Sequence, residues 1–509
     1  MAVELGFPLG VRLAHWFNLL FISLLARSGL AILSAHPKLY WNVHARPGSQ
    51  WLDLLRKPLP NDRMWCSTEE EGEWPSWIAL PGRECLGLGR YWHFATAPLW
   101  LTCGICYLVV LFTSEQWQRL VPTSWEIFPC AWNTMLAYLQ LESPEPEPPY
   151  TYELGLPFNA LQQLTYFSVI FLLTPMQILT GIAQSPSILG RFPWYERVFG
   201  SRQGARSLHF IGLVSYGIFF LIHITMVFWH NIFKELDKMV LGRDKMEGSW
   251  DAFWGGMAIV GSIVLFHIIA TLSSVYLRRA THRMLSFFVD PLRTLLLHNM
   301  RSVQHYPESK ISPYFRTNGY PPISAYSQAK PDGDDTYERL LANEFRDYRL
   351  EIFGLVQQPL KLSLEELREM PKQRQITLHH CIQGWTSIGK WGGVRLSELL
   401  DRCKPLPEAR YLVFRSFGKH EKSDAPVYYE CIDLKVARHP QTILAYELND
   451  QTLPLQHGAP LRPRFETKLG FKMVKFLRSI EFVADYRTVG EGMGGVREDR
   501  QQYDMGAEI

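Results

Sequence analysis

One stretch, RSLHFIGLVSYGIFFLIHITMVFWH at residues 206–230, constrains the fold of this chain more than any other. It has no charged side chain between Ser207 and Asn231, and a helix of that length crosses a hydrocarbon core of about 30 Å. His209 and His223 lie inside it. Fourteen residues at about 100° each return to within roughly 40° of the starting direction, so both imidazoles face one side, about 21 Å apart along the axis. A titratable ring in lipid is costly unless it is paired or bound to a metal, so this pair is typical of axial ligands to two stacked haems. Hydrogen bonding to neighbouring helices is the alternative.

Four further apolar stretches predict a five-span membrane bundle in the first 300 residues. Arg27 lies well inside the first stretch and must face the bundle, where a haem propionate or a backbone carbonyl would satisfy it. The fifth carries His267, for which we expect a packed or hydrogen-bonded role. The five spans are expected at about residues 11–33, 91–113, 159–183, 207–231 and 253–277.

Membrane depth pairs the histidines of these spans. Successive spans alternate in direction, so His15, near the start of the first, and His93, near the start of the second, lie near opposite surfaces. The fourth span runs parallel to the second. His209 therefore shares the depth of His93, and His223 that of His15.

Composition excludes several other kinds of protein. The net charge of +3 on 509 residues gives no basis for binding nucleic acid. Eight cysteines without a repeated spacing argue against a disulfide framework and a zinc ribbon, and there is no Cys-x-x-Cys-His motif for covalent haem. The first apolar run begins too early and is too long for a cleaved signal peptide, so we expect it to stay in the membrane.

The order of His15, His93 and the paired His209 and His223, with Arg12-x-x-His15-Trp16 at the start, resembles a known family. It is similar to the di-haem cytochrome b subunits of nickel-iron hydrogenases, formate dehydrogenase and thiosulfate reductase, over roughly residues 8–232. The resemblance implies a four-helix core and two b-type haems, with iron bound by the pairs His15/His223 and His93/His209. The fifth span goes beyond this core.

The second half of the chain predicts a soluble α+β domain at residues 345–489, joined by a connecting segment at 301–344 and followed by a polar tail at 490–509. Runs at 348–353, 375–379, 411–415 and 478–484 suit strands, and 362–369 and 396–401 suit helices. A strand ending at Cys381 gives way to glycines, which would place one thiol at the exposed edge of a cleft. Such a thiol could be an inert core group, a nucleophile or a soft metal ligand. The glycines, expected in turns, are Gly384, Gly389, Gly392 and Gly393.

This domain resembles the sulfite-oxidase superfamily, in particular the branch with the bacterial protein-methionine-sulfoxide reductase catalytic subunit. The carrying segments are HHCIQGWTSIGKWGGVRLSELL from residue 379, SPYFRTNGYPP at 312–322 and GAPLRPRFETKLGFKMVKFLRSIEF at 458–482. The resemblance implies that Cys381 binds molybdenum and is catalytic, and that Asn318 contacts the pterin. It also implies a phosphate site made by Lys468, Gly470, Phe471, Lys472 and Lys475. The arginines that follow the cysteine in animal and plant sulfite oxidases are absent from residues 382–387.

Together the two halves predict a membrane-bound molybdenum oxidoreductase. Haems carry single electrons, whereas oxygen-atom transfer at a molybdopterin centre moves two electrons. The haem pair would therefore connect the metal to quinone in a respiratory chain. We expect quinol, membrane lipid and a small S- or N-oxide as partners, and a further redox subunit stays open. The alternatives are a sulfite-type dehydrogenase that donates electrons to quinone, and a cytochrome b with a non-catalytic docking domain.

We expect a multi-pass protein of the bacterial inner membrane, and two arguments conflict over the side that holds the C-terminal domain. Family members with this kind of cytochrome start inside, which would export the domain. No twin-arginine leader opens the chain, and Lys and Arg near span ends favour the cytoplasm. The loops after spans one, three and five, on the side of the C-terminal domain, carry the larger number of these cations, and the charge count therefore favours a cytoplasmic domain. They are Lys38, Arg46, Arg56, Lys57, Arg63, Arg83, Arg90, Arg191, Arg197, Arg202, Arg206, Arg278, Arg279, Arg283 and Arg293, against Arg12, Arg119, Lys234, Lys238, Arg243 and Lys245 on the other side.

Overall fold

The computed structural model divides into two compact units. The helical unit comprises Met1–Ser28, Trp92–Ile182 and Ser207–Tyr276, and the mixed unit comprises Gly29–Tyr91, Ala183–Arg206 and Leu277–Ile509. The structure describes residues 7–58, 65–82, 85–142, 158–243, 247–297, 305–319, 335–418 and 427–501. The proline-rich spacer after Glu142 and most of the connecting segment lie outside these ranges.

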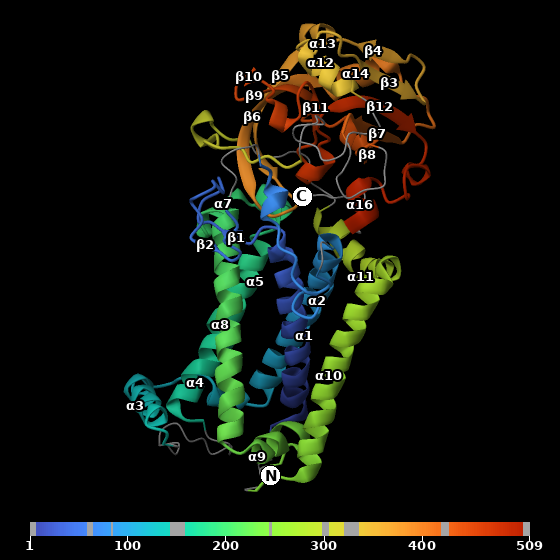
Figure 1. Cartoon of the computed structure of the whole chain (residues 1–509). Helices are drawn as coiled ribbons and strands as arrows, with labels where there is room; N and C mark the ends of the chain where they lie inside the picture. Colours follow the sequence, from blue (N-terminus) through green and yellow to red (C-terminus); the bar gives the residue numbers. More distant parts are fainter. Residues whose placement is uncertain are drawn as a thin grey trace. The chain divides into compact units, whose positions relative to one another are not determined.

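Five helices in the described part of the chain are long and apolar enough to cross a membrane, which confirms the expected bundle and makes this a multi-pass membrane protein (Figure 1). The third is interrupted by a wider π-helical turn at Ser168–Leu173. Pro175 has no N–H to donate one turn back, which accounts for the wider turn there. The helices are α1 (Leu9–Ser34), α2 (Leu86–Thr113), α4 with α5 (Ala160–Phe167, Thr174–Ile182), α8 (Arg202–Trp229) and α10 (Trp250–Tyr276).

Shorter helices close the ends of the long ones. In the helical unit α3 (Ile127–Leu139) packs on α4, whose N-cap Asn159 forms a capping box with Gln162. Helix α9 (Ile232–Leu236) packs on α10. In the mixed unit α6 (Pro186–Arg191) and α7 (Pro193–Val198) precede α8, and each begins with proline at its first position, where the missing N–H costs nothing.

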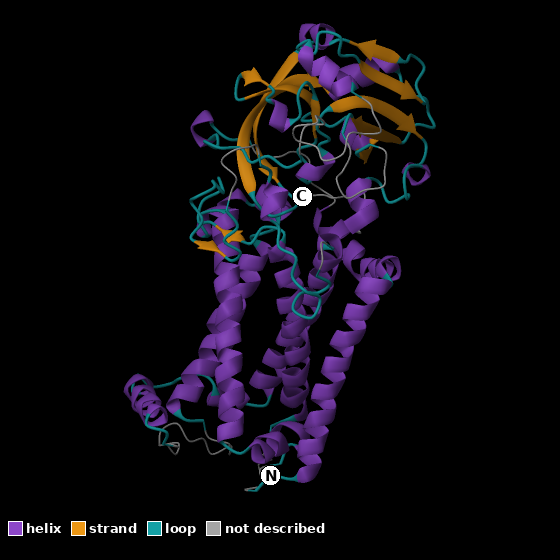
Figure 2. Cartoon of the chain, in the orientation of Figure 1, coloured by secondary structure: helices purple, strands orange, loops and turns teal. Residues whose placement is uncertain are grey.

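The strands of the described chain all lie in the mixed unit, where Figure 2 draws them in orange. One sheet has the order β10-β9-β6-β5 with β11 beside β9, and the other has the order β4-β3-β12-β7-β8. A further pair, β1 (Lys38–Leu39) and β2 (Leu52–Asp53), is antiparallel. The bounds are β3 Leu350–Gly354, β4 Leu360–Leu362, β5 Lys372–His380, β6 Thr386–Arg395, β7 Tyr411–Ser416, β8 Tyr429–Asp433, β9 Ile443–Leu448, β10 Gln451–Thr452, β11 Arg462–Arg464 and β12 Leu477–Val483.

The two sheets and their helices share one apolar core, which confirms the expected mixed domain. Its side chains come from β3, β7 and β12 and from the inner faces of α13 (Leu364–Glu369) and α14 (Leu396–Cys403). Helix α12 (Thr336–Ala342) contributes Tyr337, whose hydroxyl donates to the carbonyl of Ala459. The short α15 (Leu434–Ala437) follows β8.

Three glycines expected in turns lie instead inside strand β6. Gly389, Gly392 and Gly393 pair with β5, and a Cβ on Gly393 would come within 2.1 Å of the carbonyl oxygen of Leu444 on β9. At Gly393 the neighbouring backbone leaves no room for a side chain, whereas at Gly389 and Gly392 the nearest atoms belong to neighbouring side chains. Only Gly384 lies in the turn, with a positive φ of 107°.

Residues 490–501, expected as the start of a polar tail, instead pack against β8. Val496 on α16 (Val496–Gln501) is buried with Tyr429 and Cys431, and Glu430 forms a β-bridge with Gly495. Apolar contacts with the sheet thus hold this segment in the domain.

The mixed unit also includes two loops that the sequence assigns to the membrane half. Residues from Gly29 to Tyr91 and from Ala183 to Arg206 belong with the C-terminal domain. Helix α11 (Arg278–Leu297), which follows the fifth span, is in this unit as well. It buries Leu285 and Val289 and leaves Phe287 and Phe288 exposed.

Candidate haem and molybdenum sites

Two pairs of histidines face each other in the helical unit. The ring centroids of His15 and His223 are 6.1 Å apart, and those of His93 and His209 are 6.4 Å apart. Two metal–nitrogen bonds of about 2 Å plus the distance from each nitrogen to its ring centre give about 6 Å between two imidazoles on one iron. The spacing of both pairs therefore fits a haem iron, and the assignment as haem ligands stays a prediction.

Hydroxyl groups orient two of these rings. Ser28 Oγ lies 3.1 Å from Nδ1 of His93, and Thr180 Oγ1 lies 3.1 Å from Nδ1 of His209. A hydrogen bond at Nδ1 leaves Nε2 for a metal. Nε2 of His209 is 3.2 Å from the amide Nε2 of Gln177, which would have to move to admit iron.

The RxxHW motif anchors the start of α1 around His15. Arg12 donates to the carbonyl oxygen of Val240 at 2.7 Å, and the indole of Trp16 donates to that of Met239 at 3.2 Å. Both side chains thus satisfy the widened turn after α9, where helical carbonyls lack a regular partner.

Arg27 is satisfied by a side chain of the fifth span. Its Nη1 lies 2.8 Å from Nδ1 of His267, and its Nη2 donates to Thr271 at 2.8 Å. His267 thus has a hydrogen-bonded role, as expected. The sequence suggested a haem propionate or a carbonyl for Arg27, and this ring and Thr271 are two of its partners in the structure.

Cys381 lies directly after β5 at the start of a tight turn in the mixed unit. Its N–H donates to the carbonyl of Trp385 at 3.1 Å, and the N–H of Gly384 donates to its carbonyl at 3.0 Å. The thiol is only 4% exposed, so the expected exposed position is wrong: Ala35, Tyr40, Trp385 and neighbouring apolar groups cover it. Burial raises the pKa of this thiol to about 11.

Asn318 meets Cys381 although 63 residues separate them. Its amide Nδ2 lies 3.8 Å from the sulfur, so the two segments that the sequence assigned to the molybdenum cofactor converge. Phe315, three residues earlier, packs its ring 5.4 Å from those of His379 and His457. This aromatic contact holds the segment 312–318 against the strand that ends at the cysteine.

Gln383 links the cysteine to a loop between the first two spans. Its Oε1 lies 3.5 Å from the sulfur and accepts from Ser67 Oγ at 2.7 Å, and its Nε2 donates to the carboxylate of Glu71 at 2.7 Å. Trp385 also donates to this Oε1 at 2.7 Å. Ser67 and Glu71 were not expected at the site, because nothing in a loop sequence predicts a contact with a residue more than 300 positions away.

Two cations near this site, the partly buried Lys475 and the buried Arg462, have neutral hydrogen-bond partners. Lys475 donates to the carbonyl of Gln456 at 2.7 Å and to Thr317 Oγ1 at 3.0 Å. Arg462 donates to the carbonyls of His457 and Met473, and its Nε has no hydrogen-bond partner among the described residues. Burial and then the charge of Arg462 lower the pKa of Lys475 to about 7. Buried cations without a counter-ion are costly, so this pair fits an anionic phosphate.

The remaining predicted cofactor residues differ in their surroundings. Gly470 lies against His379: a Cβ there would come within 2.3 Å of the ring, and Arg464 fixes this ring at Nδ1. Phe471 is buried in the cluster that covers Cys381, and Lys468 is buried. Lys472 forms buried ion pairs with Glu430 and Glu498, so its ammonium is engaged inside the protein. Its role at a phosphate stays a prediction.

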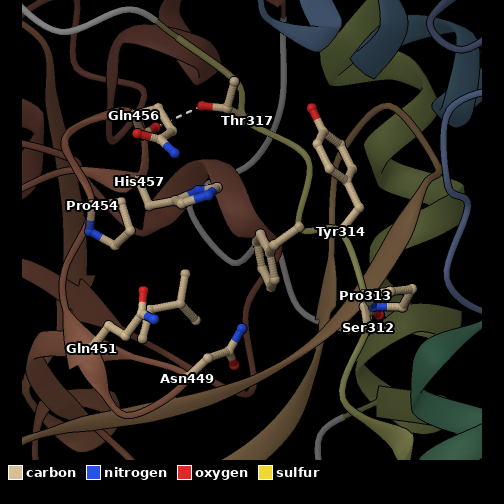
Figure 3. A pocket seen from close by; sticks show the side chains of 11 residues that line it. Ser312, Pro313, Tyr314, Thr317, Asn449, Gln451, Pro454, Gln456 and His457 are labelled. Atoms are coloured by element: carbon tan, nitrogen blue, oxygen red, sulfur yellow. Dashed lines mark hydrogen bonds between the residues drawn. The ribbon is translucent and has the colours of Figure 1, made fainter.

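A cavity of about 230 Å³ lies beside the segment 312–317 (Figure 3). Thr317, Gln456 and His457 line one part of it, and Asn449 and Gln451 line another. Thr317 donates to the carbonyl of Gln456 at 2.6 Å. Because both residues also contact Lys475, the cavity borders the proposed phosphate site.

The comparisons define the class of protein. Residues 6–242 match the family described as prokaryotic cytochrome b561, and residues 339–489 match the oxidoreductase molybdopterin binding domain. The chain therefore carries an N-terminal domain of the first family fused to a C-terminal domain of the second. The C-terminal domain is related to molybdopterin oxidoreductases and the N-terminal domain to electron-transfer cytochromes b, and these families imply b-type haem and molybdopterin as cofactors.

Individual relatives match parts of the chain. A putative protein-methionine-sulfoxide reductase subunit YedZ1 of Azospira oryzae is 35% identical over 38% of this chain and 64% of its own length. Catalytic subunits MsrP of Campylobacter jejuni and Ralstonia nicotianae are 30% and 34% identical over 28% and 27% of this chain, and over 52% and 44% of their own lengths. The chain thus spans less than two thirds of each of these relatives. A solved structure, the sulfane dehydrogenase SoxCD from Paracoccus pantotrophus, is 22% identical over 31% of this chain and 41% of its own, with a TM-score of 0.26.

Proposed function

We propose that this chain passes electrons from the quinone pool through two b-type haems to a molybdenum centre on Cys381, which reduces an S- or N-oxide. The observation that carries the proposal is the convergence of Asn318, Cys381 and Lys475 in a chain that also holds two facing histidine pairs. The MsrP and YedZ1 relatives, named as methionine-sulfoxide reductase subunits, favour an S-oxide.

The residues of the mixed unit fit a cofactor that exchanges an oxygen atom. Bound molybdopterin supplies that two-electron chemistry, and the overall reduction of a sulfoxide consumes two electrons and two protons and releases a thioether and water. Cys381 would hold the metal, and Gln383 would keep its sulfur in place. Lys475 and Arg462 would bind the phosphate. Burial of the thiol behind Tyr40 and Trp385 keeps bulk water away from the reacting atoms.

The residues of the helical unit fit two b-type haems. Such haems supply single-electron transfer. Each histidine pair would hold one iron, and Ser28 and Thr180 would fix the orientation of the two rings of the second pair, His93 and His209. Two haems hold two electrons, which is the number that a quinol releases and a sulfoxide consumes.

We propose a cytoplasmic position for the molybdenum domain on the basis of charge. Several of the counted cations have partners inside the protein: Lys38 pairs with Glu70, and Arg206 donates to the carbonyl of Lys38. Arg119, on the opposite side, is also buried. Leaving buried residues out of both counts keeps the excess on the side of this domain. Alkaline phosphatase activity from a fusion after Ile509, with a silent cytoplasmic reporter at the same position, would contradict this orientation.

The experiment that tests the function compares two cysteine variants of the full chain. Cys381→Ser should abolish sulfoxide reduction and leave the haem spectrum and membrane insertion intact, because only this thiol adjoins Asn318. Cys403→Ser is the matched control: this cysteine is also buried, and the one hydrogen bond of its sulfur in the described chain goes to the carbonyl of Leu400 on its own helix. Metal analysis of the purified wild type should find molybdenum. Wild-type turnover by Cys381→Ser would refute the assignment.

A further inference from the structure

A polar cluster lies inside the apolar zone of the helical unit, where α1 contacts α10. It joins Arg27 to His267 and Thr271, and Ser23 Oγ lies 2.8 Å from Nε2 of the same histidine. Arg27 precedes the end of α1 by seven residues and His267 precedes the end of α10 by nine. At about 1.5 Å per residue, the cluster is about 10–14 Å from those helix ends. Ionisable side chains at such depth are costly and are typical of functional sites.

The hydrogen bonds fix the protonation state of His267. A guanidinium has only donors, so Nδ1 of the ring accepts from Arg27 and must be unprotonated. Nε2 then carries the proton and donates to Ser23, whose own hydrogen is directed to the carbonyl of Leu19 at 2.7 Å. The ring is therefore a neutral base, and the lone pair on its Nδ1 accepts a hydrogen bond from the Arg27 cation.

Residues next to the cluster in sequence contact the predicted haem ligand His93 and its neighbour Trp92. Ser28, the residue after Arg27, contacts Nδ1 of His93. Trp92, the residue before His93, donates from its indole to Ser274 on α10 at 2.8 Å. A ligand bound at Arg27 would lie close to the haem that His93 is expected to hold.

The fifth span is accessible to a lipid-soluble molecule. Helix α10 lies beyond residues 6–242, which match the cytochrome b561 family, and it carries no predicted haem ligand. Next to His267, Phe266 and Ile268 are 41% and 49% exposed, and Leu272 is 50% exposed. A ring dissolved in the bilayer can reach His267 along this apolar surface.

We propose that Arg27, His267 and Thr271 form the binding site for the head group of a quinone. This proposal rests on the proposed function, and it names the site at which the quinol reacts. Thr271 accepts from Arg27 and donates to the carbonyl of His267 at 2.8 Å, so it orients the guanidinium. Arg27 donates to one quinone oxygen, and Nδ1 of His267 accepts the proton of the quinol hydroxyl once Arg27 turns to that oxygen. The quinol becomes a quinone, its two electrons pass singly to the b haems, and its two protons leave in turn through His267 to the aqueous surface.

The test measures binding of a hydroxyquinoline N-oxide, a quinol analogue whose fluorescence is quenched on binding, to the purified full chain. Thr271→Val removes the hydroxyl that orients Arg27, with little change of shape, and should weaken binding about fivefold, and His267→Gln should weaken it at least tenfold. The matched control is Thr102→Val, because this exposed hydroxyl on α2 contacts only its own helix at Pro98. Haem content and the dithionite-reduced spectrum should stay unchanged in all three variants.

The outcomes separate this site from the proposed function. If wild type binds the analogue and both variants bind it equally well, the cluster only ties α10 to α1, and the placement is wrong. If a short-chain quinol fails to reduce the haems of wild type, the quinone partner itself is wrong. Weakened binding with Thr102→Val to the same degree would also overturn the placement, since the effect would not be local.

Discussion

The Lys475→Met variant should be more stable than wild type when both lack the cofactor. Lys475 is partly buried and donates to neutral oxygens of Gln456, Thr317 and Gly319. Burial, followed by the charge of Arg462, lowers the pKa of its ammonium from 10.5 to about 7. In the protein without cofactor, these surroundings disfavour the positive charge on Lys475 that would bind a phosphate.

The size and the sign of this effect follow from the pKa. A lowering from 10.5 to about 7 corresponds to about 5 kcal/mol at about 1.4 kcal/mol per pH unit. Below pH 7 the lysine is protonated in both the folded and the unfolded state, and the charge then destabilises the folded state by the full amount. Between pH 7 and 10.5 the unfolded state binds more protons, so the free energy of unfolding rises with pH. Above pH 10.5 the lysine is neutral in both states, so it no longer destabilises the folded state.

The assay uses the full chain from a host that cannot make molybdopterin. Hydrogen exchange of peptides from residues 427–483 reports the stability of the mixed unit at pH 6.5 and pH 9.5. Lys475→Met should be protected more strongly than wild type at pH 6.5 by up to about 5 kcal/mol, and the gain should shrink at pH 9.5. In a host that makes the cofactor, the same variant should lose it. Lys435→Met, at an exposed position, should change neither the stability of the mixed unit nor the retention of the cofactor.

Two results would refute this reasoning. One is a Lys475→Met chain that is no more stable than wild type at pH 6.5. The other is a gain in stability that does not depend on pH, because the gain would then come from added apolar contact and not from removal of a buried charge.

Two other predictions concern the haem ligands and the loop that carries Glu71. His223→Ala should lower the haem content from two per chain to one, measured after release by acid acetone, and a full complement after changing both His209 and His223 would contradict the ligand assignment. Glu71→Ala should lower molybdenum retention or turnover about tenfold or more, because Gln383 loses the partner that holds it beside the sulfur. Glu73→Ala, at an exposed neighbouring position, serves as control, and an equal effect of both changes would exclude a specific role for Glu71.

Periodicity and depth predicted most of the helical unit. The confirmed spans follow from apolar runs long enough to cross a bilayer, and alternation of direction is sufficient to bring His15 to His223 and His93 to His209. The partner of Arg27 could not be derived in this way, because the rotation of α10 against α1 depends on side-chain packing and not on hydrophobic period.

Short motifs predicted part of the molybdenum site and missed the rest. Cys381 and Asn318 were found because each lies in a recognisable segment, whereas Ser67 and Glu71 come from a loop without periodicity. Arg462 lies inside the segment 458–482, but the resemblance assigns the phosphate site to the lysines of that segment. Glycines such as Gly393 are ambiguous in sequence, since the same residue permits a turn and a close approach of strands.

The central claim is that electrons pass from quinol through haem to a centre on Cys381, and one anaerobic measurement tests it most directly. The haems of the purified full chain are reduced with a short-chain quinol, and the reduced haem band is followed after rapid mixing with methionine sulfoxide. The account predicts that wild-type haems are reoxidised, two haems for each sulfoxide reduced, and that those of Cys381→Ser stay reduced. Wild-type haems that stay reduced with every S- or N-oxide, and that sulfite reduces when they start oxidised, would contradict it and reverse the direction of electron flow.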